Sequence, residues 1–294
     1  KKFIERLPTI KHLEKASEYE MLKVWQGLGY YTRARNLHAA AKDIVSNNNG
    51  ILPENYEEWL SIKGVGEYSA AAISSFAFNE ARAVVDGNVI RLLSRIYGIK
   101  DDPKKTLGKR QFTNKANELL DKNRPADFNQ AIMDFGSLVC QPRNPHCSSC
   151  TFKNNCLALK EDQIMDFPFK SPTIKKKKRF FNYLIIMQGE YTYIQKRIDN
   201  DIWKGLYQFP MIETSKIISK AKFNTEISKW NLSVKTTDTP IRHNQILSHQ
   251  LITGYFFVIN IPKQHAFNHN WKKIKWRNLQ NFAFPRLIHW YINQ

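Results

Sequence analysis

The chain has 294 residues, which is long enough for two hydrophobic cores. Lysine and arginine total 45 against 26 acidic residues, and the net charge of +19 predicts a polyanionic partner whose binding weakens with salt. No apolar run approaches the ~18 residues of a membrane span, and the first residues lack the apolar segment of a signal peptide.

The first 160 residues have the periodicity of helices. Ser17 and Glu20 have the spacing of a capping box, and an apolar run follows at helical spacing, formed by Met21, Val24, Trp25 and Leu28. A second helix is expected to bury one face, formed by Ala34, Leu37, His38, Ala41, Ile44 and Val45. Pro53 is expected to begin a short helix that ends near Ile62.

Residues 59–73 (WLSIKGVGEYSAAAI) predict a helix, a tight turn at Gly64-Val65-Gly66, and a second helix of small residues. Free N–H groups at the start of the second helix suit a phosphate, so this hairpin is expected to contact DNA without reading its sequence. Any pair of helices joined by glycines has this pattern. The net charge is what favours the DNA-binding interpretation.

Asp86 follows the apolar residues 83–85 and precedes an amphipathic helix marked by Val89, Leu92, Leu93 and Ile96. An aspartate in this place most often caps a helix. The alternative is a catalytic carboxylate at the mouth of the DNA-binding hairpin. Position alone favours the cap.

All four cysteines lie close together with the spacing C-x6-C-x2-C-x5-C, at Cys140, Cys147, Cys150 and Cys156. No cysteine remains elsewhere to staple a secreted fold, so a metal centre is expected rather than disulfides. Four thiolates suit either zinc or a four-iron cluster, and the spacing does not decide between them.

Composition changes after the cysteines. Residues 166–180 contain two prolines and a basic run, namely Pro168, Pro172 and 175–179 (KKKKR). This composition predicts a linker that is a solvated tether. Residues 181–294 contain aromatic and β-branched runs at 183–187, 191–194 and 251–259, which predict a separate α+β domain.

Four segments, in this order, resemble the helix-hairpin-helix DNA glycosylases, and among them the adenine DNA glycosylases of the MutY family. They are residues 27–37 (GLGYYTRARNL), the hairpin turn, 85–89 (VDGNV) and 128–136 (FNQAIMDFG). The resemblance implies a mostly α glycosylase domain with an iron–sulfur cluster loop over 1–165. A MutT/Nudix-like α+β domain over 181–294 would follow the basic linker.

The resemblance implies a role for each matching position. Asp86 would stabilise or trap the sugar cation as the base leaves, supported by Tyr68 and Asn88. Tyr30 would wedge into the duplex, and Gln130 would lie near the flipped adenine. The cofactor would be a [4Fe-4S] cluster held by the four cysteines.

The second domain resembles the part of this family that reads 8-oxoguanine, on residues 203–210 (WKGLYQFP). The family's Phe-Ser-His signature stands here as Leu247-Ser248-His249, so Ser248 and His249 would contact the lesion. The glutamate cluster of Nudix pyrophosphatases is missing after Pro210, and nucleotide hydrolysis is therefore not expected.

The implied activity is hydrolytic removal of adenine mispaired with 8-oxoguanine or guanine, in base excision repair. A monomer acting on duplex DNA in the bacterial cytoplasm, at the nucleoid, is expected. Endonuclease III-like lyases resemble the chain but place a nucleophilic lysine where Tyr68 stands, and a tyrosine forms no imine. The family's general acid, a glutamate, would lie upstream of residue 1. The chain is therefore expected to be incomplete, and a non-catalytic lesion-binding module is the other alternative.

Overall fold

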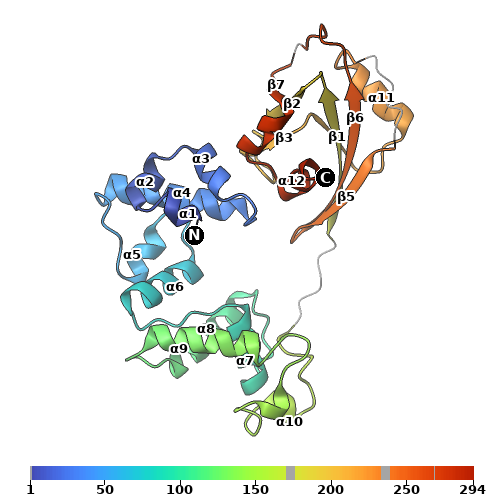
Figure 1. Ribbon diagram of the computed structural model, residues 1–294. Helices are drawn as coiled ribbons and strands as arrows, with labels where there is room; N and C mark the ends of the chain where they lie inside the picture. The colour runs from blue at the N-terminus through green and yellow to red at the C-terminus, as the bar shows by residue number, and fades with distance from the viewer. Residues whose placement is uncertain (1, 170–175, 233–238, 268) are drawn as a thin grey trace. The chain divides into compact units, whose positions relative to one another are not determined.

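The structure, a computed structural model, describes residues 2–169, 176–232, 239–267 and 269–294 (Figure 1). The chain forms two compact units. Unit 1 combines residues 1–38 with 174–294, and unit 2 comprises residues 39–173. The boundary between them falls inside one helix, α4 (Tyr31–Asn47). The first helices share contacts with residues far along the chain, which groups them in unit 1. The domain bounds expected from the sequence, 1–165 and 181–294, stay predictions.

Unit 2 is helical. After the second half of α4 it contains α5 (Tyr56–Ser61), α6 (Glu67–Phe78), α7 (Gly87–Tyr97), α8 (Thr106–Leu119), α9 (Pro125–Leu138), the 3₁₀ turn η1 (Cys147–Ser149) and α10 (Leu157–Lys160). The core lies between α7, α8 and α9, where Val89, Leu93, Phe112 and Ala116 are buried. This core fixes the position of the start of α7, where Asp86 stands.

Capping residues determine where α3 and α5 begin. Ser17 and Glu20 form the predicted capping box at α3 (Glu18–Val24). Asn55, rather than Pro53, caps α5, because its side-chain Oδ1 accepts a hydrogen bond from the Glu58 backbone N–H at 3.0 Å. α5 begins at Tyr56, so the start expected at Pro53 is three residues too early.

The first half of α4 and the short helices α1 (Lys2–Arg6), α2 (Ile10–Lys15) and α3 belong to unit 1. Ala34 and His38 are buried on α4 as predicted, and the His38 imidazole Nε2 lies 2.9 Å from the Ala16 carbonyl oxygen. Leu37 is 40% exposed, so its expected burial on α4 is wrong. Leu28, expected to continue the helical run of Met21, is 60% exposed. Leu28 lies beyond the end of α3, in the loop to α4.

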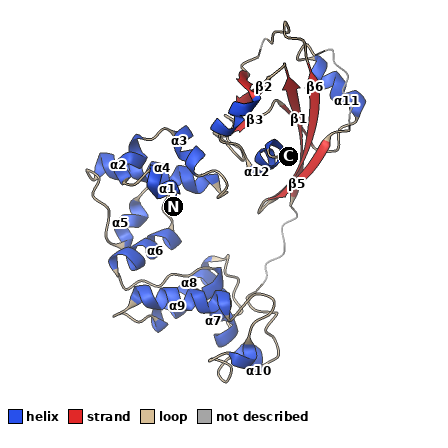
Figure 2. Cartoon of the chain, in the orientation of Figure 1, coloured by secondary structure: helices blue, strands red, loops and turns tan. Residues whose placement is uncertain are grey.

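The C-terminal part of unit 1 contains two sheets (Figure 2). The first has the order β4-β1-β6-β5, in which long β1 and β6 are parallel and the outer pairs are antiparallel. The second has the order β3-β2-β7 and is antiparallel. The strands are β1 (Lys177–Met187), β2 (Tyr191–Lys196), β3 (Tyr207–Gln208), β4 (Met211–Thr214), β5 (Ile241–Ile246), β6 (Gln250–Asn260) and β7 (Lys272–Lys275).

Helices pack on both faces of the β1–β6 pair. Phe223 of α11 (Lys220–Ser228) stacks on Phe257, with ring centroids 3.8 Å apart. Tyr291 of α12 (Arg286–Ile292) stacks on the adjacent Phe256 at 4.3 Å. Adjacent strand residues point to opposite faces, so α11 and α12 cover opposite sides of β6. The 3₁₀ turn η2 (Trp276–Asn281) precedes α12.

Part of the expected linker is strand. β1 begins at Lys177, so the basic run is divided between loop and sheet, whereas Pro172 and Lys175 lie outside the described residues. Arg179 is 7% exposed, and its guanidinium pairs with the carboxylates of Asp201 and Glu213 at 2.6 Å each. This arginine therefore anchors the start of the sheet instead of lying in a solvated tether.

Candidate functional site

Asp86 is the N-cap of α7 and is held by three hydrogen bonds. Its Oδ1 accepts from the backbone N–H groups of Asn88 and Val89, both at 2.8 Å, and its Oδ2 accepts from the Asn88 side-chain Nδ2 at 2.9 Å. The capping interpretation is confirmed by this geometry. The cap also fixes the orientation of the carboxylate, which is what a catalytic role requires.

A buried amide holds the segment that leads to Asp86. Asn129 of α9 is 1% exposed, and its Oδ1 accepts from the Val84 N–H at 2.9 Å. Its Nδ2 donates to the Arg82 carbonyl and to the Ser75 hydroxyl, at 2.8 Å each. The amide oxygen and both amide hydrogens of Asn129 thus have partners. These hydrogen bonds fix the backbone conformation of the segment before Asp86.

Asn88 connects Asp86 to the cysteine loop. Its Oδ1 accepts from an Arg91 Nη2 at 2.9 Å, and the Arg91 Nε donates to the Cys140 carbonyl at 2.8 Å. The same arginine also donates to the carbonyl of Gly136. A Cβ on Gly136 would lie 2.8 Å from the Asn88 carbonyl oxygen, so α7 and α9 touch at this point.

One helical turn further, Arg95 holds the cysteine loop directly. It is 2% exposed, and it donates to the carbonyls of Gln141 at 2.8 Å, Pro142 at 3.2 Å and Ile164 at 3.0 Å. Its Nη1 also lies 3.4 Å from the Cys140 Sγ. A buried guanidinium therefore fixes both the backbone and one sulfur of this loop.

The four cysteines line one small cavity, together with Leu92, Ile96 and Phe152. Burial raises the pKa of the Cys147 thiol, and the negative charges of the other three cysteine sulfurs raise it further. Within the described ranges, no three His, Cys, Asp or Glu side chains converge closely enough to hold a single ion. A four-iron cluster takes one thiolate at each iron, so its ligands need not meet at one point. The four sulfurs around a shared cavity are the set of thiolates that such a cluster takes.

The hairpin turn lies between α5 and α6. Gly64 has φ +90°, and the Val65 N–H donates to the Ile62 carbonyl at 3.0 Å. Gly66 is the N-cap of α6 and provides no side-chain cap, and a Cβ built on it would meet nothing within 4 Å. The start of α6 is thus open to another backbone, as the phosphate-contact prediction requires.

Tyr68 belongs to the first turn of α6 and is 51% exposed. Burial of part of its ring raises the pKa of the phenol, and the negative charge of Asp86 raises it further. Tyr68 therefore lies within electrostatic reach of Asp86, which brings the hairpin and the carboxylate to one place in unit 2.

Tyr30 and Ser248 meet in unit 1. Tyr30 is 70% exposed and has φ 47°, in a loop where Gly27 and Gly29 also have positive φ. Its hydroxyl lies 3.4 Å from the Ser248 hydroxyl, which stands at the exposed tip between β5 and β6. Two residues from distant parts of the sequence, both predicted to contact DNA, are thereby brought together.

The remaining predicted residues are placed separately. Gln130 is exposed and donates to Asp134 on its own helix at 2.9 Å, and His249 is exposed beside Ser248. The roles of all these residues stay predictions. Sequence reasoning missed Asn129, Arg91 and Arg95. The available signals were an asparagine inside the 128–136 motif and two arginines spaced i, i+4 on the amphipathic helix after Asp86.

Comparison with known proteins identifies both parts of the chain. Residues 1–118 match the family described as HhH-GPD superfamily base excision DNA repair protein, and residues 182–294 match the NUDIX domain. The adenine DNA glycosylase of Buchnera aphidicola subsp. Baizongia pistaciae is 36% identical over 288 residues, covering 95% of this chain and 78% of that protein. The chain belongs to the adenine DNA glycosylase family.

Further matches agree with this family assignment. The adenine DNA glycosylase of Buchnera aphidicola subsp. Acyrthosiphon pisum is 30% identical over 292 residues, 98% of this chain and 82% of that protein. The structure of a thermostable thymine-DNA glycosylase superposes with a TM-score of 0.50 and 27% identity, over 54% of this chain and 74% of that one.

Family and fold confirm the predicted class: a helical base excision glycosylase followed by a Nudix-like α+β domain. The chain is a glycosylase by family, and neither the lyase nor the non-catalytic module is favoured. Among the described helices, none is long and apolar enough to cross a lipid bilayer.

Proposed function

We propose that this adenine DNA glycosylase family member removes adenine mispaired with 8-oxoguanine or guanine from duplex DNA, by hydrolysis and without a lyase step. The observation that carries the proposal is Asp86, a carboxylate fixed by three hydrogen bonds beside the phenol of Tyr68. We expect the protein to act as a monomer, on the chromosomal DNA of a bacterial cytoplasm.

A base inside a duplex must leave the stack before its glycosidic bond is reachable. The open backbone at Gly64, Val65 and Gly66 suits a flanking phosphate, which would hold the duplex without reading sequence. The ring of Tyr30 is exposed on a loop in which three residues have positive φ. An exposed ring on such a tight loop is suited to insertion into the base stack. We assign Gln130, exposed on α9, to the neighbourhood of the flipped adenine.

The chemical step breaks the bond between C1′ of the sugar and N9 of adenine. Positive charge develops on the sugar, and adenine leaves after taking up a proton from a general acid. Water then adds to C1′ and gives up a proton, which restores the acid. A carboxylate that is already oriented stabilises this cation without reorganising during the reaction. Asn88 holds that orientation, because it contacts Asp86 through both its backbone N–H and its side chain.

Tyr68 supports hydrolysis over lyase chemistry. A lyase needs an amine that attacks C1′ and forms an imine, and a phenol provides none. The raised pKa of Tyr68 keeps the phenol protonated at neutral pH, so its O–H is available as a hydrogen-bond donor in the pocket.

We assign a [4Fe-4S] cluster to Cys140, Cys147, Cys150 and Cys156, on the basis of the shared cavity and the family. When bound, the cluster would cross-link the loop over residues 140–156 through four Fe–S bonds. Arg95 would then hold the same loop through its carbonyls. In the Nudix-like domain, we assign reading of 8-oxoguanine to Ser248 and His249, which stand exposed at the tip between β5 and β6.

Single-turnover release of adenine tests the proposal. Asp86→Asn keeps the cap but removes the charge, so excision from an adenine–8-oxoguanine duplex should fall by about 10²–10³-fold while duplex binding persists. The matched control is Asp121→Asn, because Asp121 also caps backbone N–H groups, at 2.9 Å to Asn123 and 3.3 Å to Arg124, in an exposed turn. Equal rates for Asp86→Asn and wild type would contradict the proposal.

A further inference from the structure

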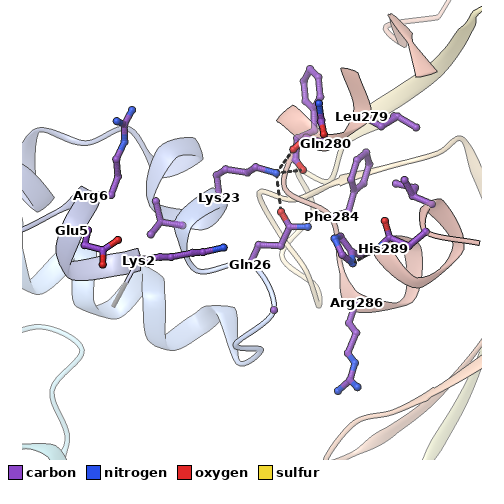
Figure 3. A pocket seen from close by; sticks show the side chains of 15 residues that line it. Lys2, Glu5, Arg6, Lys23, Gln26, Leu279, Gln280, Phe284, Arg286 and His289 are labelled. Atoms are coloured by element: carbon purple, nitrogen blue, oxygen red, sulfur yellow. Dashed lines mark hydrogen bonds between the residues drawn. The ribbon is translucent and has the colours of Figure 1, made fainter. Parts of the chain in front are cut away.

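Within unit 1, side chains from α3 and α4 donate hydrogen bonds to backbone carbonyls of the Nudix-like domain. Lys23 donates from Nζ to the carbonyls of Gln280 and, at 3.0 Å, of Phe282, and it also binds the Gln26 side chain (Figure 3). The Tyr19 hydroxyl donates to the carbonyl of Asn281. These three acceptors are consecutive carbonyls of one short segment, residues 280–282.

A second segment is held in the same way. Arg35 of α4 donates from Nη1 to the Lys204 carbonyl at 2.9 Å. All of these hydrogen-bond acceptors are main-chain groups, so this part of the contact depends on the backbone path of residues 203–205 and 280–282. The ring of Tyr19 also meets the rings of Phe282 and Tyr207 edge-on, with ring centroids 6.3 Å and 6.2 Å apart. We refer to Tyr19, Lys23 and Arg35 as the docking residues.

Gly205 is the point of closest approach. It has φ +83°, and a Cβ built on it would lie 2.8 Å from Glu18 Oε1 and 2.9 Å from Leu22 Cδ1. Glu18 has a flexible side chain that can move aside, but Leu22 is fully buried. Only glycine both adopts this backbone conformation without strain and leaves room for α3.

The docked helices flank the loop that carries Tyr30. α3 ends at Val24 and α4 begins at Tyr31, so the positions of both ends of the loop follow from this contact. The same unit places the Tyr30 hydroxyl 3.4 Å from Ser248. The residue proposed to enter the DNA stack and the residue proposed to read the lesion are therefore held in one frame before DNA binds.

We infer that the docking residues, with Gly205, determine how strongly the protein distinguishes adenine opposite 8-oxoguanine from adenine opposite guanine. This role requires no contact between the docking residues and DNA. They are positioning residues that set the separation of Tyr30 and Ser248, and so decide whether both reach the same base pair. This inference rests on the proposed function, because it assumes that the lesion is the ligand of Ser248.

Equilibrium binding of the whole chain to two duplexes tests the inference, one with adenine opposite 8-oxoguanine and one with adenine opposite guanine. Arg35→Met should reduce the ratio of the two affinities by about tenfold, the effect of losing a charge-assisted hydrogen bond. Lys42→Met is the matched control, because it removes one exposed cation from the same helix. It should weaken both duplexes alike and leave the ratio unchanged.

A glycine pair removes charge from the comparison. Gly205→Ala and Gly189→Ala both place an alanine at positive φ, +83° and +62° respectively. The Gly189 Cβ would meet only Lys263 Cε at 3.9 Å, whereas the Gly205 Cβ meets α3. Gly205→Ala should lower the affinity ratio, and Gly189→Ala should not.

Hydrogen–deuterium exchange of the free protein reports docking independently of DNA. Amides over residues 203–207 and 280–284 should exchange faster in Arg35→Met and in Gly205→Ala than in either control. Faster exchange with an unchanged affinity ratio would overturn the inference while leaving the proposed function intact. A wild-type protein that binds the two duplexes equally would overturn the inference together with the assignment of lesion reading to Ser248, even with exchange as expected.

Discussion

Two pairs of buried arginines hold the two parts of this protein in different ways. Arg91 and Arg95 of unit 2 are 8% and 2% exposed, and they donate to backbone carbonyls, an amide oxygen and a sulfur. Arg179 and Arg197 of the Nudix-like domain are 7% and 8% exposed, and they pair with the carboxylate of Asp201. All four side chains are buried, but the acceptors of the two pairs differ in charge.

The two arginine pairs differ in the source of the negative charge that balances them. Asp201 and Glu213 neutralise the Nudix-like pair locally, and their hydrogen bonds raise the pKa of Arg179 above its usual range. Among the ion pairs of the described residues, none joins Arg91 or Arg95 to a carboxylate within 4.0 Å. A buried cation without a paired anion is costly. The arginines of α7 are thus suited to thiolates, and a bound iron–sulfur cluster would complete their environment.

The largest effect is expected at Arg95. Arg95→Met removes hydrogen bonds to three carbonyls and a sulfur, which should destabilise unit 2 by about 3–4 kcal/mol and release the cofactor. Iron content and thermal unfolding measure the two consequences. Arg110→Met, at an exposed position on α8, should change neither. A stable, iron-loaded Arg95→Met protein would remove the distinction between the two arginine pairs.

Removing a ligand tests the same comparison from the side of the anion. Cys147→Ser should lose the cluster, and the loop over residues 140–156 should then weaken its hold on duplex DNA, because it presents basic residues such as Lys153. The wild-type protein, purified anaerobically, should be brown and contain iron. A colourless protein with one bound zinc would contradict the assignment and leave Arg95 without a cluster to balance.

A smaller effect is expected at the reading tip of the Nudix-like domain. Ser248→Ala combined with His249→Ala should reduce the preference for adenine opposite 8-oxoguanine by roughly 1–3 kcal/mol, the value of one or two hydrogen bonds. Competition binding with the adenine–guanine duplex measures it. Ser228→Ala, an exposed serine on α11, serves as the control. An unchanged preference would move lesion reading elsewhere in residues 181–294.

The smallest effect is a pH dependence confined to the carboxylate-paired arginines. Hydrogen bonding to Arg179 lowers the pKa of Asp201 below its ordinary value of 3.8. The stability from this pair is therefore fully present above that value and is lost as pH falls through the lower, folded-state pKa. Amide exchange in β1 and β4, followed from neutral pH into the acid range, should accelerate at the low end. Asp201→Asn should lack this step, and an identical profile would contradict the assignment.

Local features were predictable because they depend on neighbouring residues. The capping box at Ser17, the cap at Asp86 and the extent of β6 follow from spacing along one segment. The family resemblance added the catalytic class and the Nudix-like domain, and both are confirmed. The ligand set and the individual site roles remain predictions.

Other features depended on contacts between distant segments. The parallel pairing of β1 with β6 and the clearance at Gly205 involve residues far apart in sequence, and no local pattern encodes them. The role of Arg95 was not predictable, because only the folded cysteine loop provides its carbonyl acceptors. Leu37 fitted the helical period and is nevertheless exposed. Periodicity predicts that an apolar face exists, but not which other segments cover it.

The docking of α3 has a consequence for how the protein is made. Tyr19 of α3 binds the Asn281 carbonyl, 262 positions later in the chain. This contact can therefore form only after most of the chain has been synthesised. Loop-closure entropy grows only slowly with length, and the equilibrium cost of such separation is modest. Folding rate falls more steeply with contact separation. We therefore expect unit 2 to fold while the ribosome is still translating, and the first helices to remain a target for chaperones until translation has passed residue 284.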